Sequence, residues 1–291
     1  MVEPVATEPR RRSVLCASPA GLHRMAYREW GDPRNRDVLV CVHGLTRSGQ
    51  DFDELARALR AQFRIVCPDV AGRGDSDRLA DPKLYVWAQY VADMVTLIAR
   101  LDVETVNWLG TSMGGFIGMA LAAQAGSPVR KLILNDAGPL LAKASLERIR
   151  TYVGAAPVFP SIEDAEKYIR TISAPFGPHS DAQWRFLTET WVRKNEDGSW
   201  RPHYDPRIAE PFPAGDEDVD VWPVYDAVRC PTLLIRGEHS DLVSRQTVAE
   251  MTRRGPRAKV VEIRGVGHAP TLLHAEQIAI VRDFLLEGEP T

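Results

Sequence analysis

Short apolar stretches alternate with longer amphipathic stretches along most of the chain. The clearest short stretch is Val38–Val42, five β-branched or apolar residues that run directly into His43-Gly44. A continuous apolar run of this length is typical of a parallel strand that is buried on both faces. The same pattern recurs at 63–67, 106–109, 131–134, 232–235 and 259–263. We therefore predict a strand at each of these places.

The stretches between the predicted strands have apolar residues at helical spacing. They cover residues 52–59, 86–101, 116–125, 247–252 and 276–286. Strands that alternate with helices are typical of an α/β protein with a parallel sheet between helical layers. The expected fold class is α/β, with a mostly parallel sheet flanked by helices.

One segment, residues 138–221, interrupts the alternation. It contains nine of the 21 prolines, and helical spacing is found only at 162–172 and 182–192. A loop of this length without structure of its own would be unusual in a compact domain. We expect a helical cap (lid) inserted into a core formed by 19–137 and 222–291. The polar residues 1–18 show neither pattern and are predicted to be a disordered N-terminal tail.

Composition and charge narrow the function classes. The 291 residues are 44% hydrophobic and 26% charged, with a net charge of −3, which is typical of a globular protein. Near-neutral charge disfavours nucleic acid and anionic lipid as partners. No apolar run approaches the roughly 18 residues of a membrane-spanning helix. We expect a small-molecule substrate, no nucleic-acid or membrane partner, and an open possibility of homo-oligomers.

The cysteines and the N-terminus predict where the protein works. The four cysteines are widely spaced, and most of them fall inside apolar runs, which indicates buried, reduced thiols. No apolar stretch of secretory-signal length follows the basic run at residues 10–12. The expected location is cytoplasmic.

The motif Gly110-Thr111-Ser112-Met113-Gly114 follows a predicted strand and precedes a helix rich in small residues. In this context G-x-S-x-G predicts a nucleophile elbow, a strained turn that exposes the serine oxygen. The following helix also points its N-terminus at the site, where it would stabilise the negative charge that forms during acyl transfer. Ser112 is the candidate nucleophile.

A serine nucleophile needs a base, and the base needs an acid to orient it. His268 lies in a glycine-rich loop after the strand at 259–263, and such strand ends are where α/β sheets build their sites. The acid should follow a strand and lie between the serine and the histidine in the chain. Asp241 meets both conditions and is the predicted acid, with Asp136, after the strand at 131–134, as its alternative.

The oxyanion of an acyl-transfer intermediate needs two N–H donors. The backbone N–H of Met113, directly after the nucleophile, would provide one of them. The loop after Val38–Val42 would provide the other, and Leu45 is the candidate there. His43 in the same loop is expected to hold the loop by hydrogen bonds.

Together these motifs resemble those of the α/β-hydrolase superfamily, in its serine-nucleophile branch. The resemblance spans residues 20–287, with the motifs in the family's order. It rests on His43-Gly44, Gly72-Arg73-Gly74-Asp75-Ser76, Gly110-Thr111-Ser112-Met113-Gly114-Gly115, Asn135-Asp136-Ala137-Gly138-Pro139, Arg236-Gly237-Glu238-His239-Ser240-Asp241 and Gly267-His268-Ala269-Pro270. The resemblance implies an eight-stranded sheet, a cap inserted after the sixth strand, and a triad of Ser112, Asp241 and His268.

The expected reaction is hydrolysis of a carboxylic ester or related acyl bond through an acyl-serine intermediate. The elbow and cap also resemble those of meta-cleavage-product hydrolases, so C–C bond hydrolysis stays open, as does lactone hydrolysis. A ligand receptor on the same fold is the non-enzymatic alternative. Arg47 is a candidate for binding a substrate carboxylate, and a structural ion pair is its alternative role. We expect no metal and no cofactor.

Overall fold

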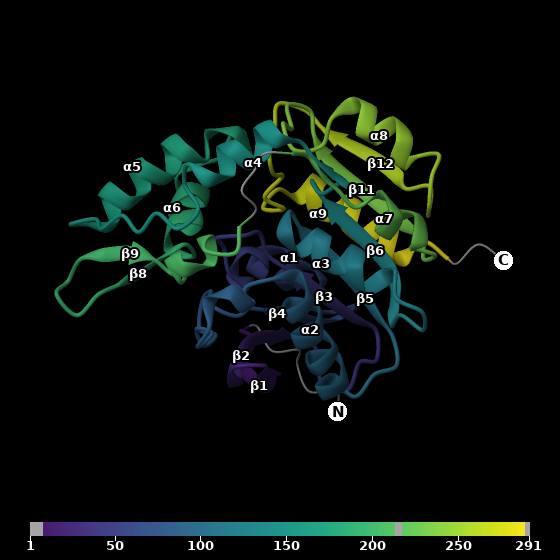
Figure 1. Cartoon of the computed structure of the whole chain (residues 1–291), viewed down its shortest axis with the longest axis horizontal. Coiled ribbons are helices and arrows are strands. Elements are labelled where there is room, and N and C mark those ends of the chain that lie inside the picture. The colour runs from purple at the N-terminus through teal and green to yellow at the C-terminus, as the bar shows by residue number, and fades with distance from the viewer. Residues whose placement is uncertain (1–7, 213–216, 289–291) are drawn as a thin grey trace.

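A computed structural model describes residues 8–212 and 217–288 of the chain. Its central sheet has eight strands in the order β1-β2-β4-β3-β5-β6-β11-β12 (Figure 1). The strands are β1 Arg10–Ser18, β2 Gly21–Trp30, β3 Val38–Val42, β4 Arg64–Pro68, β5 Val106–Thr111, β6 Val129–Asn135, β11 Thr232–Gly237 and β12 Lys259–Ile263. Within this sheet the neighbours among β4, β3, β5, β6, β11 and β12 pair in parallel, whereas β2 pairs antiparallel with β1 and β4. The expected eight-stranded, mostly parallel sheet is confirmed.

Alternate side chains of the parallel strands build two separate hydrophobic cores. In β3, Val38, Val40 and Val42 face one core, and Leu39 and Cys41 face the other. The first core is covered by α2 Trp87–Leu101, α3 Met113–Ala122, α7 Trp222–Ala227 and α8 Arg245–Met251. The second core is covered by α1 Asp53–Leu59 and α9 Ala275–Leu286. Burial on both faces explains why β3 is a continuous apolar run in the sequence.

The prediction of a disordered tail over residues 1–18 is wrong for Arg10–Ser18, which forms β1. This strand pairs with β2 along its whole length in a hairpin. Most β1 side chains are exposed, and Val14 and Cys16 are the buried ones. An edge strand with one solvated face is largely polar in sequence, and we therefore predicted a tail. Residues 1–7 of the predicted tail lie outside the described residues.

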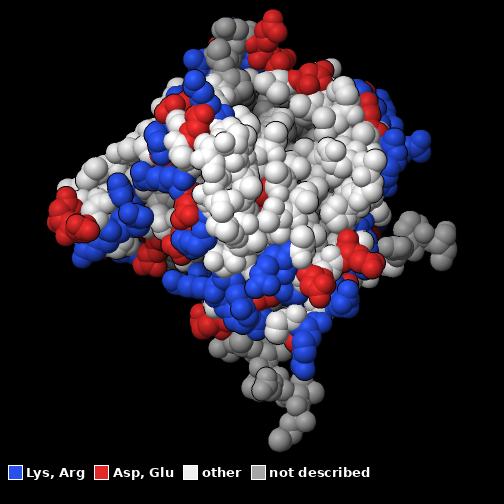
Figure 2. Space-filling view, turned by 60° about the horizontal axis from the view of Figure 1, so that its bottom comes forward, with Lys and Arg blue, Asp and Glu red and all other residues white. Residues whose placement is uncertain are grey.

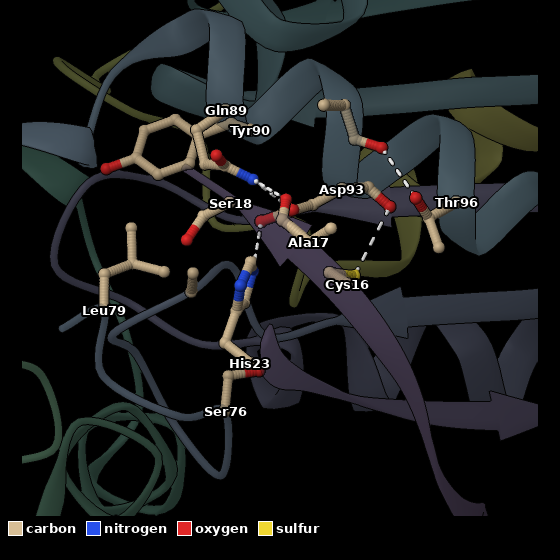
Figure 3. Close-up of polar contacts among 12 residues, drawn as sticks. Cys16, Ala17, Ser18, His23, Ser76, Leu79, Gln89, Tyr90, Asp93 and Thr96 are labelled. Carbon is tan, nitrogen blue, oxygen red and sulfur yellow. Dashed lines mark hydrogen bonds and ion pairs between the residues drawn. The ribbon is translucent and has the colours of Figure 1, made fainter. Parts of the chain in front are cut away.

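Buried polar side chains attach this hairpin to α2 (Figure 3). Asp93 of α2 is hydrogen-bonded to His23 Nε2 at 2.9 Å and accepts from Gln89 Nε2 at 2.7 Å. Gln89 Nε2 also donates to the backbone oxygen of Ala17 at 2.9 Å. Cys16, His23 and Asp93 place atoms that can ligate a metal within 4.8 Å of one another. Burial raises the pKa of the Cys16 thiol to about 12, which opposes the thiolate that a metal would require.

Residues 138–221, which the sequence predicts to be a cap, follow β6, and we refer to their described part as the cap. Two short strands, β7 Leu140–Leu141 and β10 Val219–Asp220, pair antiparallel, so the chain leaves and rejoins the core at one place. Between them lie α4 Lys143–Arg150, α5 Ile162–Ile172, α6 Asp181–Glu189 and the hairpin of β8 Val192–Lys194 and β9 Trp200–Pro202. The cap also contains two short 3-10 helices, Ala174–Phe176 and Pro206–Ala209, and two more occur in the core, Gly49–Phe52 and Pro82–Leu84.

The outer part of the cap has a hydrophobic core of its own. Its buried side chains come from α5, α6 and the segments around them, and include Phe159, Ile169, Trp184, Leu187 and Trp191. The helices begin at serine N-caps, Ser161 for α5 and Ser180 for α6, whose side chains accept from backbone N–H groups of the first turn. This internal packing lets the cap project beyond the sheet, as Figure 1 shows.

Charged side chains are unevenly distributed over the molecular surface. The face viewed in Figure 2 has a wide central area of uncharged residues, and Lys and Arg gather along its lower border. In residues 8–212 and 217–288, no helix combines the length and the apolar composition needed to cross a bilayer.

Candidate active site

Ser112 lies in a tight turn between β5 and α3 with strained backbone angles, φ 51° and ψ −114°. Glycines on both sides make this turn possible. A Cβ on Gly110 would come within 2.1 Å of the Gly114 backbone oxygen, and one on Gly114 within 2.0 Å of the Val42 backbone oxygen. These contacts explain why G-x-S-x-G is needed where the helix crosses the strand.

The structure brings His268 to the Ser112 hydroxyl. The distance from His268 Nε2 to Ser112 Oγ is 3.0 Å, which is within hydrogen-bond reach for a base and its nucleophile. His268 lies in the loop after β12, and its side chain is 15% exposed. The two residues are separated by 156 positions in the sequence and meet because both follow parallel strands of one sheet.

The other ring nitrogen of His268 contacts Asp136. Its Nδ1 lies 2.7 Å from Asp136 Oδ2, and a carboxylate can only accept, so Nδ1–H donates. Asp136 directly follows β6 and is completely buried. It also accepts from the Gly237 N–H at 3.2 Å and from the Ser240 hydroxyl at 2.7 Å. These bonds hold the carboxylate in place and fix the orientation of the imidazole.

Asp241, the predicted acid, is not at this position, and that prediction is wrong. The Asp241 side chain is 49% exposed and forms an ion pair with Arg148 of α4. The turn explains the difference, because the Ser240 hydroxyl accepts from the Leu242 and Val243 N–H groups while it donates to Asp136. The turn therefore directs Ser240 toward the site and Asp241 toward the cap.

The two predicted oxyanion donors border the same cavity as Ser112. Met113 is the first residue of α3, and the first N–H groups of a helix have no partner within the helix. Leu45 follows β3, and its carbonyl oxygen accepts from the Nε of the buried Arg73 at 2.9 Å. Arg73 therefore fixes the position of the Leu45 backbone.

His43 secures the same loop, as expected from the sequence. The Val70 N–H donates to His43 Nε2 at 2.9 Å, so the neutral ring carries its proton on Nδ1, which donates to the Gly44 oxygen at 2.7 Å. Complete burial lowers the pKa of His43 to about 3. His43 therefore stays neutral and holds the loop at all pH values above that range.

We expect this buried histidine to make the fold sensitive to acid. Between pH 6.5 and about 3 the unfolded chain binds a proton at His43 and the folded chain does not, so stability is lost as the pH falls. The free energy of unfolding should decrease by about 2 kcal/mol from pH 7 to pH 5 on this account. Urea unfolding at both pH values measures it. A His43→Gln variant with the same pH dependence as the wild type would contradict this explanation.

Arg47, the candidate for a substrate carboxylate, is engaged elsewhere. Its guanidinium makes two bonds to Asp51, at 2.8 and 2.6 Å, and also donates to the Leu187 oxygen and the Thr190 hydroxyl of the cap. These contacts match the structural ion pair that the sequence left open. Arg47 joins the core to the cap, and only part of its side chain borders the site.

Two cavities meet at Ser112. The larger, of about 450 Å³, lies between α2, α4 and the Met113 side of the elbow, and it includes Tyr85, Trp87, Phe116 and Phe212 in its wall. The smaller, of about 150 Å³, has His268 in its wall, and the cap covers it with residues from α4 to Tyr204. We did not predict either cavity, because their walls come from segments far apart in the sequence.

A family model described as the alpha/beta hydrolase fold matches residues 37–275. A 3-hydroxybutyrate-oligomer hydrolase from Cupriavidus necator is 52% identical, over 96% of this chain and 99% of its own. An esterase from Escherichia coli is 27% identical, over 84% of this chain and 89% of its own.

A solved structure of an alpha/beta hydrolase also resembles this chain. The crystal structure of an alpha/beta hydrolase from Novosphingobium aromaticivorans superimposes with a TM-score of 0.87. It is 37% identical, and the match covers 96% of this chain and 99% of that one. The likeness therefore includes the cap as well as the sheet.

Proposed function

The chain belongs to the alpha/beta hydrolase family and is a hydrolase of ester or related acyl bonds, and we propose that it cleaves short oligomers of 3-hydroxybutyrate or a similar hydroxy acid. The observation that carries the chemistry is the unbroken chain of hydrogen bonds from Ser112 through His268 to Asp136. The substrate class is supported by the relative that is 52% identical over nearly the whole of both chains.

In the first half of the proposed reaction, His268 Nε2 takes the proton of the Ser112 hydroxyl as Oγ attacks the ester carbonyl. The N–H groups of Leu45 and Met113 stabilise the oxyanion, and Asp136 stabilises the imidazolium through Nδ1–H. His268 then gives its proton to the oxygen of the leaving alcohol as the acyl–oxygen bond breaks. The acyl group remains on Ser112.

In the second half, a water molecule takes the place of the alcohol beside His268. His268 removes a proton from this water, which attacks the acyl-serine carbonyl, and the same two N–H groups stabilise the second oxyanion. Collapse of the intermediate returns the proton to Ser112 Oγ and releases the acid. The reaction consumes one water for each ester bond.

Initial rates on defined substrates test the proposed function. The 3-hydroxybutyrate dimer and p-nitrophenyl butyrate should both be hydrolysed, and the dimer should have the higher kcat/KM. Hydrolysis of p-nitrophenyl esters without turnover of the dimer would contradict the substrate class. Loss of a yellow dienoate substrate in place of any ester would favour C–C hydrolysis.

Cytoplasmic location is also part of the proposal. It is supported by the cysteines, because Cys16, Cys41 and Cys67 are buried as free thiols inside the core. Buried thiols of this kind act as small hydrophobic side chains.

A further inference from the structure

The two cavities that meet at Ser112 differ in chemistry. No charged residue among the described part of the chain borders the larger cavity, which is lined by aliphatic and aromatic side chains. Both cavities have tyrosines in their walls, but among the described residues only the smaller one has charged side chains there, the arginines Arg47 and Arg148. In residues 8–212 and 217–288, no Asp or Glu borders it. The smaller cavity is therefore suited to an anionic group and the larger one to an apolar group.

The position of His268 indicates which part of an ester each cavity would receive. His268 must protonate the leaving oxygen, so the leaving alcohol lies on the histidine side of the scissile bond. His268 borders the smaller cavity and does not border the larger one. The smaller cavity is then the leaving-group side, and the acyl group extends into the larger cavity beside Met113.

Of the two arginines, Arg148 is the one available to a ligand. Arg47 makes four hydrogen bonds, two to Asp51 of the core and two to Leu187 and Thr190 of the cap. Arg148 pairs with Asp241, whose side chain is half exposed outside the cavity, and it lies beside the Tyr152 hydroxyl. Arg148 contacts the two carboxylate oxygens of Asp241 through Nε and one terminal nitrogen, and its guanidinium has five N–H donors, so donors remain for a ligand.

We propose that the smaller cavity binds a leaving alcohol that carries a carboxylate, and that Arg148 binds this carboxylate. This inference rests on the proposed ester hydrolysis and defines its substrate further. The volume of this cavity, about 150 Å³, is a third of the 450 Å³ of the larger one, so the smaller cavity suits the shorter part of the substrate, a single hydroxy acid. The enzyme then removes one unit at a time from the carboxylate end of an oligomer.

The order of bond cleavage follows from this placement. The acyl–oxygen bond of the last ester breaks, and His268 gives its proton to the oxygen of the terminal unit. This unit leaves as a free hydroxy acid, and the shortened oligomer stays on Ser112 until water releases it with a new carboxylate. The product is thereby ready to bind again with its new end beside Arg148.

A pair of matched substrates tests the role of Arg148. The first is 3-(butyryloxy)butanoate, and the second is its methyl ester, which has the same scissile bond without the charge. Arg148→Met should lower kcat/KM for the acid by about 10- to 100-fold relative to the methyl ester, mainly through KM. Arg148→Lys should restore part of the preference for the acid.

Asp241→Asn is the matched control, because it breaks the same ion pair and leaves the arginine in place. This variant should keep or increase the preference for the acid. If Arg148 only braces the cap, Arg148→Met and Asp241→Asn will change both substrates alike, and that result would overturn the proposal. A wild-type enzyme that prefers the methyl ester would overturn it while the ester hydrolysis stands, whereas failure to hydrolyse any ester would refute both.

The direction of cleavage has its own test. A 3-hydroxybutyrate trimer with an isotopic label in the carboxylate-terminal unit should release labelled monomer first, together with unlabelled dimer. Release of unlabelled monomer first would show cleavage from the hydroxyl end and contradict the assignment of the cavities.

Discussion

Replacing Asp136 by Asn should lower kcat for p-nitrophenyl butyrate by about four orders of magnitude at neutral pH. Asp136 accepts from His268 Nδ1–H at 2.7 Å. An asparagine can present an N–H to the ring instead, which places the imidazole proton on Nε2 and removes the acceptor that Ser112 needs. The size of the side chain is unchanged, so the buried site should keep its packing. Steady-state rates at saturating substrate measure the effect.

Asp241→Asn is the control for this experiment. Asp241 is half exposed, is paired with Arg148 and does not contact His268, so its replacement should change kcat for p-nitrophenyl butyrate by less than about threefold. If Asp241→Asn lost activity as Asp136→Asn is expected to, Asp241 would be the acid in the working enzyme. The geometry of the turn at Ser240 would then have to change during turnover.

Replacing Ser112 by Ala should have the largest effect on activity, a loss of about 10⁴- to 10⁶-fold in kcat. The variant lacks the oxygen that forms the covalent bond, and the remaining oxyanion donors give only a small residual rate. The thermal unfolding midpoint should stay close to that of the wild type, because only one polar atom at the cavity surface is removed. Retention of most of the turnover by a folded Ser112→Ala enzyme would refute the assignment of the nucleophile.

Much of the fold could be predicted from the sequence because of how the parallel strands are buried. Helices cover both faces of β3, β5 and β6, so β3 is apolar throughout, and the other two strands contain apolar runs that are easy to locate. The edge strand β1 of the antiparallel hairpin is different, since most of its side chains are exposed. Its polar residues resemble a tail, and only the pairing along the whole of β1 identifies it as part of the sheet.

The candidate site was predictable where a motif fixes the backbone. Ser112 and His268 belong to such motifs, and they lie 3.0 Å apart. The identity of the acid could not be predicted, because Asp136 and Asp241 both follow strands and both precede His268 in the chain. Their roles are separated by hydrogen bonds of the Ser240 side chain, which a linear pattern does not contain.

The contacts between the cap and the core also could not be predicted from the sequence. Arg47 and Arg148 both border the smaller cavity. Arg47 binds Asp51 and the cap, whereas Arg148 pairs with the half-exposed Asp241. No local pattern distinguishes these two arginines. Their difference depends on where α6 lies relative to the loop after β3, and on where α4 lies relative to the loop after β11.

The most direct test of the acyl-serine mechanism is rapid acid quench of the enzyme mixed with p-nitrophenyl butyrate, followed by mass mapping of its peptides. If the mechanism is correct, the peptide containing Ser112 will gain the mass of one butyryl group during turnover and lose it when the substrate is exhausted. Continued hydrolysis with that peptide unmodified at every time point, in the wild type and in Ser112→Ala alike, would contradict it.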